Sequence, residues 1–169
     1  MANVQATPQM GFMEAVKACF AKYCNFNGRA RRSEFWWFYL AVAAVNMVLG
    51  WILQIFAAKK AEAAQAALDN FDINNLDSLN QAASQDSGYA TINLILLIIM
   101  VIWSLGTLLP LLGAWARRLH DVGKSGWLLL CGLICGVGII IPLVLAIPDG
   151  KPEANQYGES PKYKDLDKA

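Results

Sequence analysis

The chain has 169 residues, of which 56% are hydrophobic and only 16% are Asp, Glu, Lys or Arg. Soluble globular domains carry about 25% charged residues. Three windows contain no formal charge, at residues 35–58, 87–116 and 125–148. Each is longer than the roughly 20 residues that a helix needs to cross a bilayer. These values exclude a soluble enzyme, a secreted disulfide scaffold, a disordered tail and a nucleic-acid binder with a basic face.

The charges outside these windows predict a topology. Residues 1–34 carry five Lys or Arg against two acids, residues 59–86 carry two cations against five acids, and residues 117–124 carry three cations with one acid. Lys and Arg near helix ends are retained in the cytoplasm, whereas acids contribute little. We therefore expect the N-terminus inside, the acidic loop outside and the segment 117–124 inside.

The predicted fold is all-α, a polytopic membrane protein with an interfacial helix and three transmembrane helices. We expect a cytoplasmic segment at 1–34, a membrane domain at 35–148 and a tail at 149–169. The spans cover about 35–58, 89–116 and 125–148, with an outer loop at 59–88. The Ala-rich run at 57–67 can prolong the first helix beyond the bilayer, and residues 69–86 form the exposed part of the loop. Three full spans place the tail outside, whereas a re-entrant third window, favoured by its Gly and Pro residues, would place it inside. The first window is too long for a cleaved signal and should remain as an anchor.

An amphipathic helix of about 16 residues is predicted near the N-terminus. Thr7 can cap it, and Pro8 fits its first position. Apolar side chains recur at three- and four-residue steps on one face. They are Phe12, Met13, Val16, Cys19, Phe20 and Tyr23. The helix is too short to span, so it either lies in the membrane interface or packs onto the cytoplasmic ends of the spans.

Two further features concern the predicted second and third spans. Pro110 should bend the second span, with Gly106 and Thr107 accommodating the freed carbonyl, and Gly123 should end it as a left-handed cap. In the third window Gly132 and Gly136 form a GxxxG motif, which favours packing against another span of the same chain over a dimer face. The four cysteines contain no CxxC pair, and there is one His, so neither a metal site nor a cofactor is predicted. Cys24 lies at a position suited to palmitoylation, although a small apolar filler is the simpler interpretation for all four cysteines.

Two cytoplasmic clusters, residues 29–34 and 116–124, are the candidate site. If the first two spans are antiparallel neighbours, Glu34 can pair with an Arg of the second cluster, and Asp121 with an Arg of the first. Arg117 and Asp121 can also pair along one helix, which would leave His120 and Asp121 structural and not a catalytic dyad. The clusters and the adjoining Trp residues form a basic and aromatic face for anionic headgroups or a partner membrane protein. Its candidate residues are Arg29, Arg31, Arg32, Glu34, Trp36, Trp37, Arg117, Arg118, His120, Asp121 and Lys124.

Three stretches resemble one protein family. They are residues 27–37 (NGRARRSEFWW), residues 116–127 (ARRLHDVGKSGW), and Asn155 with Tyr157, Gly158 and Pro161. Together they look like the bacterial inner-membrane family called domain of unknown function 805, from about Phe12 to Pro161. The resemblance implies a small multi-pass protein of the bacterial inner membrane, with no established activity, substrate or cofactor. The segment 57–86 departs from the family's shorter connection and is a candidate for contact with a partner outside.

Our functional expectation is a non-enzymatic membrane protein that binds anionic lipid, or a partner protein or second copy, through the cytoplasmic face. The alternative is a small transporter or channel component, with polar residues lining a path beside Pro110. These residues are Asn46, Gln54 and Asn93. No span carries a charge, which argues against coupled transport. An enzyme built on His120 and Asp121 ranks third, since no nucleophile motif, metalloprotease motif or phosphate loop is present.

Overall fold

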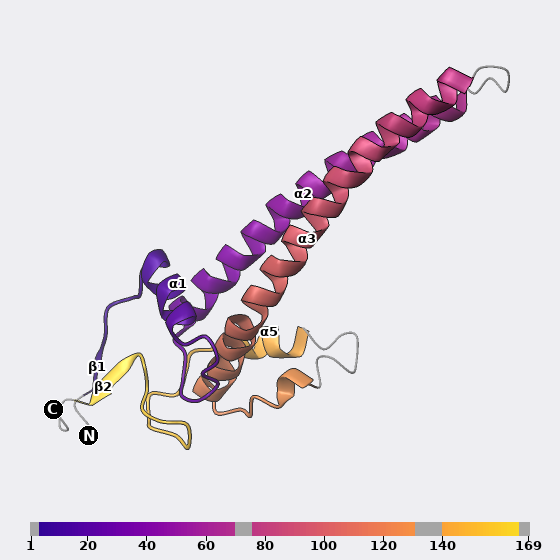
Figure 1. Cartoon of the computed structure of the whole chain (residues 1–169). Helices are drawn as coiled ribbons and strands as arrows, with labels where there is room; N and C mark the ends of the chain where they lie inside the picture. The colour runs from indigo at the N-terminus through magenta and orange to yellow at the C-terminus, as the bar shows by residue number, and fades with distance from the viewer. Residues whose placement is uncertain (1–3, 70–75, 131–139, 166–169) are drawn as a thin grey trace. The chain divides into compact units, whose positions relative to one another are not determined.

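The computed structural model describes residues 4–69, 76–130 and 140–165, and it is mostly helical (Figure 1). It divides into two compact units, Met1–Val42 with Gly106–Ala169, and Ala43–Leu105, which we treat separately. The elements in chain order are β1 (Val4–Ala6), α1 (Phe12–Ala21), α2 (Arg32–Asp69), α3 (Leu76–Asp121), α5 (Ile140–Ala146) and β2 (Tyr163–Asp165).

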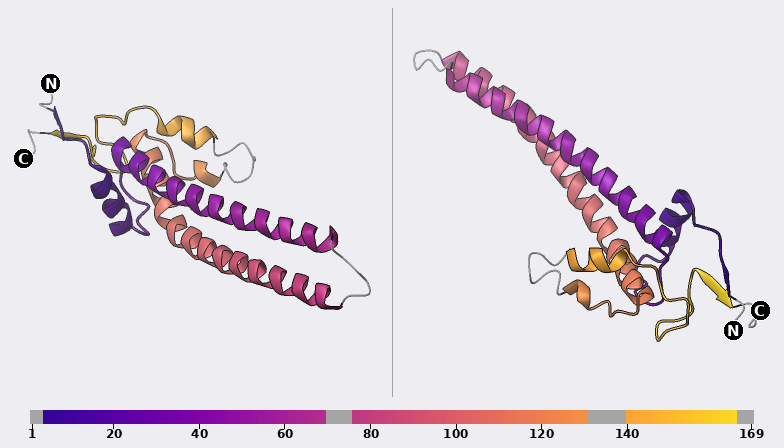
Figure 2. Two further views of the ribbon diagram at one scale, coloured as in Figure 1. Left: turned by 90° about the horizontal axis from the view of Figure 1, so that it is seen from above. Right: turned by 180° about the vertical axis from the view of Figure 1, so that it is seen from behind.

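The unit Ala43–Leu105 holds the larger parts of α2 and α3, which run in opposite directions (Figures 1 and 2). Large apolar side chains are exposed along both helices, including Trp51 at 71% and Ile102 at 65%. Only 6% and 11% of the most apolar windows of the two helices are buried within the protein. Because such surfaces are unfavourable in water, hydrocarbon is their natural solvent. The first two charge-free windows are therefore confirmed as helices able to cross a membrane.

The prolongation of the first helix through the Ala-rich run at 57–67 is confirmed, whereas the exposed loop predicted at 69–86 is wrong from Leu76 onward. Helix α2 continues to Asp69, and α3 already begins at Leu76, so only residues 70–75 lie outside the described helices. Extending an existing helix needs no new nucleation, and the Ala-rich run after Ala57 has high helix propensity. The Asn, Asp and Ser residues at 77–86 are typical of loops, yet they form the first turns of α3.

Helix α1 is shorter than predicted and begins at a different residue. It starts at Phe12, where the Gly11 N–H donates to Glu14 Oε2 at 3.1 Å. Thr7 does not cap it; the Thr7 hydroxyl donates to the Lys162 carbonyl at 3.1 Å. Of the predicted apolar face, Cys19 is buried, whereas Phe12 is 44% exposed. The helix packs on the start of α2, with Phe20, itself 40% exposed, edge-on to buried Phe38 at 5.5 Å between ring centroids.

The core of the first unit is an aromatic cluster between the start of α2 and the end of α3. Phe35 lies edge-on to Trp115, with ring centroids 4.7 Å apart, and both are buried. Phe38 and Val42 extend this core along α2, and Ala146 of α5 joins it. This packing holds the charged segments before α2 and at the end of α3 side by side, which positions the candidate site.

Pro110 lies inside α3 as predicted, and its consequence is visible one turn earlier. Proline has no N–H, so the Gly106 carbonyl loses its helical donor. The Tyr23 hydroxyl donates to that carbonyl at 2.7 Å. Tyr23 follows α1, so this bond ties the N-terminal segment to α3. The helix ends at Asp121 with Gly123 at φ +80°, which confirms the predicted left-handed cap.

The third predicted span is not confirmed. The described part of this window contains α5, Ile140–Ala146, which by itself does not make up the roughly 20 residues of a span. Gly132, Gly136 and the rest of residues 131–139 lie outside the described residues. Two candidate spanning helices are found among the described residues, within α2 and α3.

The C-terminal tail lies beside the N-terminal segment. Strands β1 and β2 pair antiparallel, with Val4 opposite Asp165 and Ala6 opposite Tyr163. The Thr7 N–H continues this pairing by donating to the Lys162 carbonyl at 2.8 Å. Three full spans would place these two segments on opposite sides of a membrane, so the sheet disagrees with that arrangement.

Candidate functional site

The two predicted clusters meet, and the two predicted cross-cluster ion pairs are present. Arg29, before α2, pairs with Asp121 at the end of α3, with 2.9 Å between Nη2 and Oδ1. Arg117 lies 3.8 Å from Glu34, measured from Nη2 to Oε1. All four side chains are at most 5% exposed. A backbone hydrogen bond from Ala30 N to the Arg117 carbonyl, at 3.0 Å, locks the two segments together.

Asp121 is the centre of the first pair and accepts from two arginines. Oδ1 takes the Arg29 bonds, and Oδ2 accepts from Arg118 Nη1 at 2.5 Å. The predicted Arg117–Asp121 pair is wrong, because Arg118, three residues away, takes this place. Arg117 points elsewhere and donates to the Asn25 carbonyl. The helix end is therefore closed by ion pairs, as the structural interpretation predicts.

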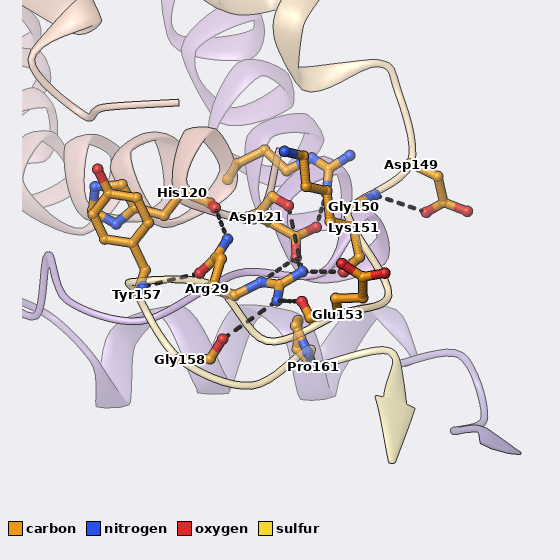
Figure 3. Close-up of polar contacts among 12 residues, drawn as sticks. Arg29, His120, Asp121, Asp149, Gly150, Lys151, Glu153, Tyr157, Gly158 and Pro161 are labelled. Atoms are coloured by element: carbon orange, nitrogen blue, oxygen red, sulfur yellow. Dashed lines mark hydrogen bonds and ion pairs between the residues drawn. The ribbon is translucent and has the colours of Figure 1, made fainter. Parts of the chain in front are cut away.

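The tail wraps around Arg29 (Figure 3). The guanidinium donates to the carbonyls of Lys151 and Glu153, the latter at 2.8 Å. The chain can pass this closely because residue 150 is glycine: a Cβ there would lie 1.9 Å from Asp121 Oδ2. Arg118 holds the preceding segment by donating to the Ala146 and Pro148 carbonyls. These buried cations satisfy tail carbonyls that have no regular secondary-structure partner.

The second pair binds the helix α1 segment to α2. Lys22 Nζ lies 3.1 Å from Glu34 Oε1, so this carboxylate is shared by Lys22 and Arg117. Cys19 is buried beside it, and burial together with the Glu34 charge raises the pKa of its thiol to about 11. Cys19 is therefore a protonated packing residue at neutral pH.

His120 is buried but is not paired with Asp121. Its Nδ1 lies 3.2 Å from the Gly28 carbonyl, and its ring stacks on Tyr157 with centroids 3.7 Å apart (Figure 3). Asn155 Nδ2 donates to the His120 carbonyl at 2.8 Å. The Asp121 oxygens are occupied by arginines, so the two side chains do not form a dyad. Within the described residues, no group of three or more His, Cys, Asp or Glu is placed to hold a metal ion.

Burial divides the predicted basic and aromatic face into two parts. Five of its charged residues are structural and inaccessible: Arg29, Glu34, Arg117, Arg118 and Asp121. The accessible part is a pocket of about 420 Å³ at the start of α2, here called the polar pocket. It is lined by Gln9, Arg31, Arg32, Ser33, Trp36, Trp37, Asp149 and Lys162.

The polar pocket carries a net positive charge. Arg31 Nη1 donates to the Thr7 hydroxyl at 3.0 Å and to the Pro8 carbonyl, and Arg31 forms no ion pair with a carboxylate in the described part of the chain. Asp149 contacts Lys162 and lies 4.0 Å from Arg32. The hydrogen bond from Lys162 lowers the pKa of Asp149 and raises the pKa of Lys162. Both groups are therefore charged across the neutral range, and three cations face one acid.

Sequence reasoning missed Gln9, Ser33, Asp149 and Lys162 as members of this pocket. Lys162 is more than a hundred residues from Arg31 in the sequence, and only the pairing of β1 with β2 brings them together. Lys124, which was predicted in the site, is exposed after α3 and does not line this pocket.

Of the proposed transport residues, Asn93 donates to the Tyr89 carbonyl of its own helix at 3.1 Å, and Gln54 is exposed.

The chain is a helical membrane protein by its fold. It has two long helices whose apolar side chains are exposed and whose ends carry charged and aromatic residues. Residues 23–159 match the family model described as "Protein of unknown function (DUF805)", and the chain belongs to this family, as its motifs indicated. It is 27% identical to inner membrane protein YhaI of Escherichia coli K12 over 83% of this chain and 89% of that protein. It is 28% identical to inner membrane protein YhaH of the same strain over 84% of this chain and 91% of that protein. No solved structure matches the chain at a significant level.

Proposed function

We propose that the chain crosses the bacterial inner membrane twice, with both termini in the cytoplasm. Its relatives are inner membrane proteins, and cations gather before the first window and after the second. The pairing of β1 with β2 supports both termini on one side, and with it an even number of crossings.

The ends of the third window support this topology. A Cβ on Gly126 would lie 3.2 Å from Ala116 Cβ, and Ala146 accepts a bond from Arg118, two residues further along α3. A straight helix over residues 125–148 would separate its ends by about 35 Å. The contacts of Gly126 and Ala146 with neighbouring residues of α3 support the re-entrant alternative.

Cysteine accessibility tests the topology. In a cysteine-free background, Gln5→Cys and Ala154→Cys should react with a membrane-impermeant maleimide only in inverted vesicles. Asn80→Cys, between the two spans, should react only in spheroplasts. Labelling of Ala154→Cys from the opposite side to Gln5→Cys would refute two crossings.

We further propose that the polar pocket binds the phosphate headgroup of an anionic phospholipid, as a non-enzymatic function. The single observation that supports this most is the meeting of Arg31, Arg32 and Lys162 beside Trp36 and Trp37 at the start of an apolar helix. Cations beside Trp residues are typical of the water-to-lipid boundary.

Two details of the pocket fit a phosphate. Ser33 lines the pocket, and its buried hydroxyl has no hydrogen-bond partner in the described structure, so a phosphate oxygen at this wall would satisfy it. The first helical bond of α2 runs from Phe35 N to the Arg31 carbonyl, so the N–H groups of Arg32, Ser33 and Glu34 precede it. Helix N-termini of this kind stabilise anions.

Lipid binding by charge-neutralised variants tests the proposal. The double variant Arg31→Gln/Arg32→Gln removes two cations, each worth about 1 kcal/mol near an anionic surface, so binding of phosphatidylglycerol should weaken about 30-fold. The matched control Lys17→Gln/Lys124→Gln makes the same charge change away from the pocket. Native mass spectrometry in nanodiscs of phosphatidylcholine with added phosphatidylglycerol would measure the bound lipid.

Equal losses in both double variants would contradict a specific pocket and indicate a diffuse surface effect. Unchanged lipid binding in both, with loss of a co-purifying membrane protein in the Arg31 and Arg32 variant, would favour a protein partner. Thermal melting of each variant must match the original chain, because Arg31 also contacts the Thr7 hydroxyl.

A further inference from the structure

A second cavity, separate from the polar pocket, opens beside the end of α3. Its volume is about 490 Å³, within the range of ligand-binding pockets. Its lining residues come from the turn before Arg29, the end of α3, the segment after Gly123, and the tail. Apolar side chains form most of its wall, including Phe26, Leu112, Trp127, Leu129 and Leu130. We call it the apolar cavity.

His120 supplies the apolar cavity with a buried side-chain acceptor. His120 lines the cavity and is only 8% exposed. Its Nδ1 faces the Gly28 carbonyl at 3.2 Å, and a carbonyl can only accept, so Nδ1 carries the proton of the neutral ring. Nε2 is then an acceptor, and a Cβ on Gly126 would lie 3.2 Å from it. The stacked Tyr157 ring fixes the imidazole plane.

A hydroxyl of the chain also lines the cavity. Ser125 Oγ accepts a hydrogen bond from the Trp127 N–H at 3.3 Å. The hydroxyl proton of Ser125 can therefore be donated to a ligand. Among the described residues that line the cavity, none is Asp, Glu, Lys or Arg. A charged headgroup would therefore lose its hydration without a counter-charge, which is costly. The chemistry favours a neutral head that both donates and accepts hydrogen bonds.

The approach to the cavity is apolar. Trp127 is 77% exposed and Leu130 is 49% exposed, and both line it. Exposed Trp and Leu side chains favour the lipid boundary over water, so we place this rim there. A ligand that enters there must itself partition into the bilayer, and a cavity of this size suits one chain better than two.

We propose that the apolar cavity binds a neutral single-chain amphiphile of the monoacylglycerol type, whose hydroxyl donates to His120 Nε2 and whose acyl chain packs against Leu112 and Leu130. This site differs from the polar pocket in residues and in ligand charge, and it does not depend on the anionic lipid proposed there. It gives buried His120 a role in ligand recognition and none in catalysis.

Binding of monoolein to the full chain in phosphatidylcholine nanodiscs tests the proposal, with native mass spectrometry as the readout. His120→Phe keeps a flat ring for Tyr157 but removes the acceptor, and should weaken monoolein binding about tenfold. Leu130→Trp should fill the cavity and block binding. The matched control Leu108→Trp makes the same change on an exposed residue of α3 outside the lining, and should bind like the original chain.

A second ligand and a second variant complete the test: the ligand isolates the contribution of the hydroxyl, and the variant separates this cavity from the polar pocket. Methyl oleate has the same chain without a donor and should bind about tenfold more weakly than monoolein. The variant Arg31→Gln/Arg32→Gln should retain monoolein, so failure of this proposal is distinguishable from failure of the anionic lipid site. Equal binding of methyl oleate and monoolein, or full binding by folded Leu130→Trp, would overturn the proposal. Loss of monoolein in Leu108→Trp would do the same.

Discussion

The substitution Asp121→Asn should be among the most damaging single-atom changes in the protein. Asp121 is 5% exposed, and its partners Arg29 and Arg118 are 1% and 0% exposed at their side chains. Removing the carboxylate charge leaves two buried guanidinium groups without a counter-ion. Breaking a buried ion pair in this way costs about 3–5 kcal/mol. At about 2–4 °C per kcal/mol for a chain of this size, the melting temperature should fall by about 6–20 °C.

Thermal unfolding followed by tryptophan fluorescence would measure this loss in nanodiscs. Glu62→Gln is the matched control, since Glu62 also forms an ion pair across three residues, with Lys59 at 2.8 Å, but both side chains are more than half exposed. The Glu62→Gln variant should melt at the same temperature as the original chain, because exposed ion pairs contribute little to the free energy of unfolding. If Asp121→Asn also melts within one or two degrees, the argument that the buried network holds the two clusters together is refuted.

Three other predictions concern the tail, the polar pocket and the thiols. Arg29→Ala should release the tail, because the Glu153 carbonyl loses its donor. Limited digestion with a Glu-specific endoprotease should then cleave after Glu153 faster than in the original chain, and unchanged cleavage would contradict a role of Arg29 in holding the tail. Asp149→Asn should tighten anionic lipid binding several-fold, because it removes the acid that lowers the positive charge of the polar pocket; weaker binding would show that Asp149 orders the pocket. Peptide mapping after maleimide treatment at pH 8 should find exposed Cys24 labelled and buried Cys19 protected. A thiol with its pKa raised to about 11 carries almost no thiolate at pH 8, so labelling of Cys19 should rise only as the pH approaches 11. Equal labelling rates of the two cysteines at pH 8 would show that the burial of Cys19 is transient.

The sequence alone determined the membrane class, the two long helices and the meeting of the charged clusters. Windows without charge report on the solvent of each segment, and this property depends on composition and not on packing. The pairing of Asp121 with an Arg of the first cluster followed from placing two antiparallel helix ends together. The choice of Arg118 over Arg117 did not follow, because both neighbours can reach Asp121 and only the surrounding carbonyls decide which one turns toward it.

Only the tertiary structure decided which cations are free and where the tail lies. Arg31 and Arg117 look alike in the sequence, yet Arg31 borders an open pocket and Arg117 is 1% exposed. Exposure depends on contacts between segments far apart in the chain, above all the pairing of β1 with β2 and the passage of Gly150 against Asp121. Local composition carries no information about such contacts, since their stability comes from long-range packing and hydrogen bonds that exist only once the chain has folded.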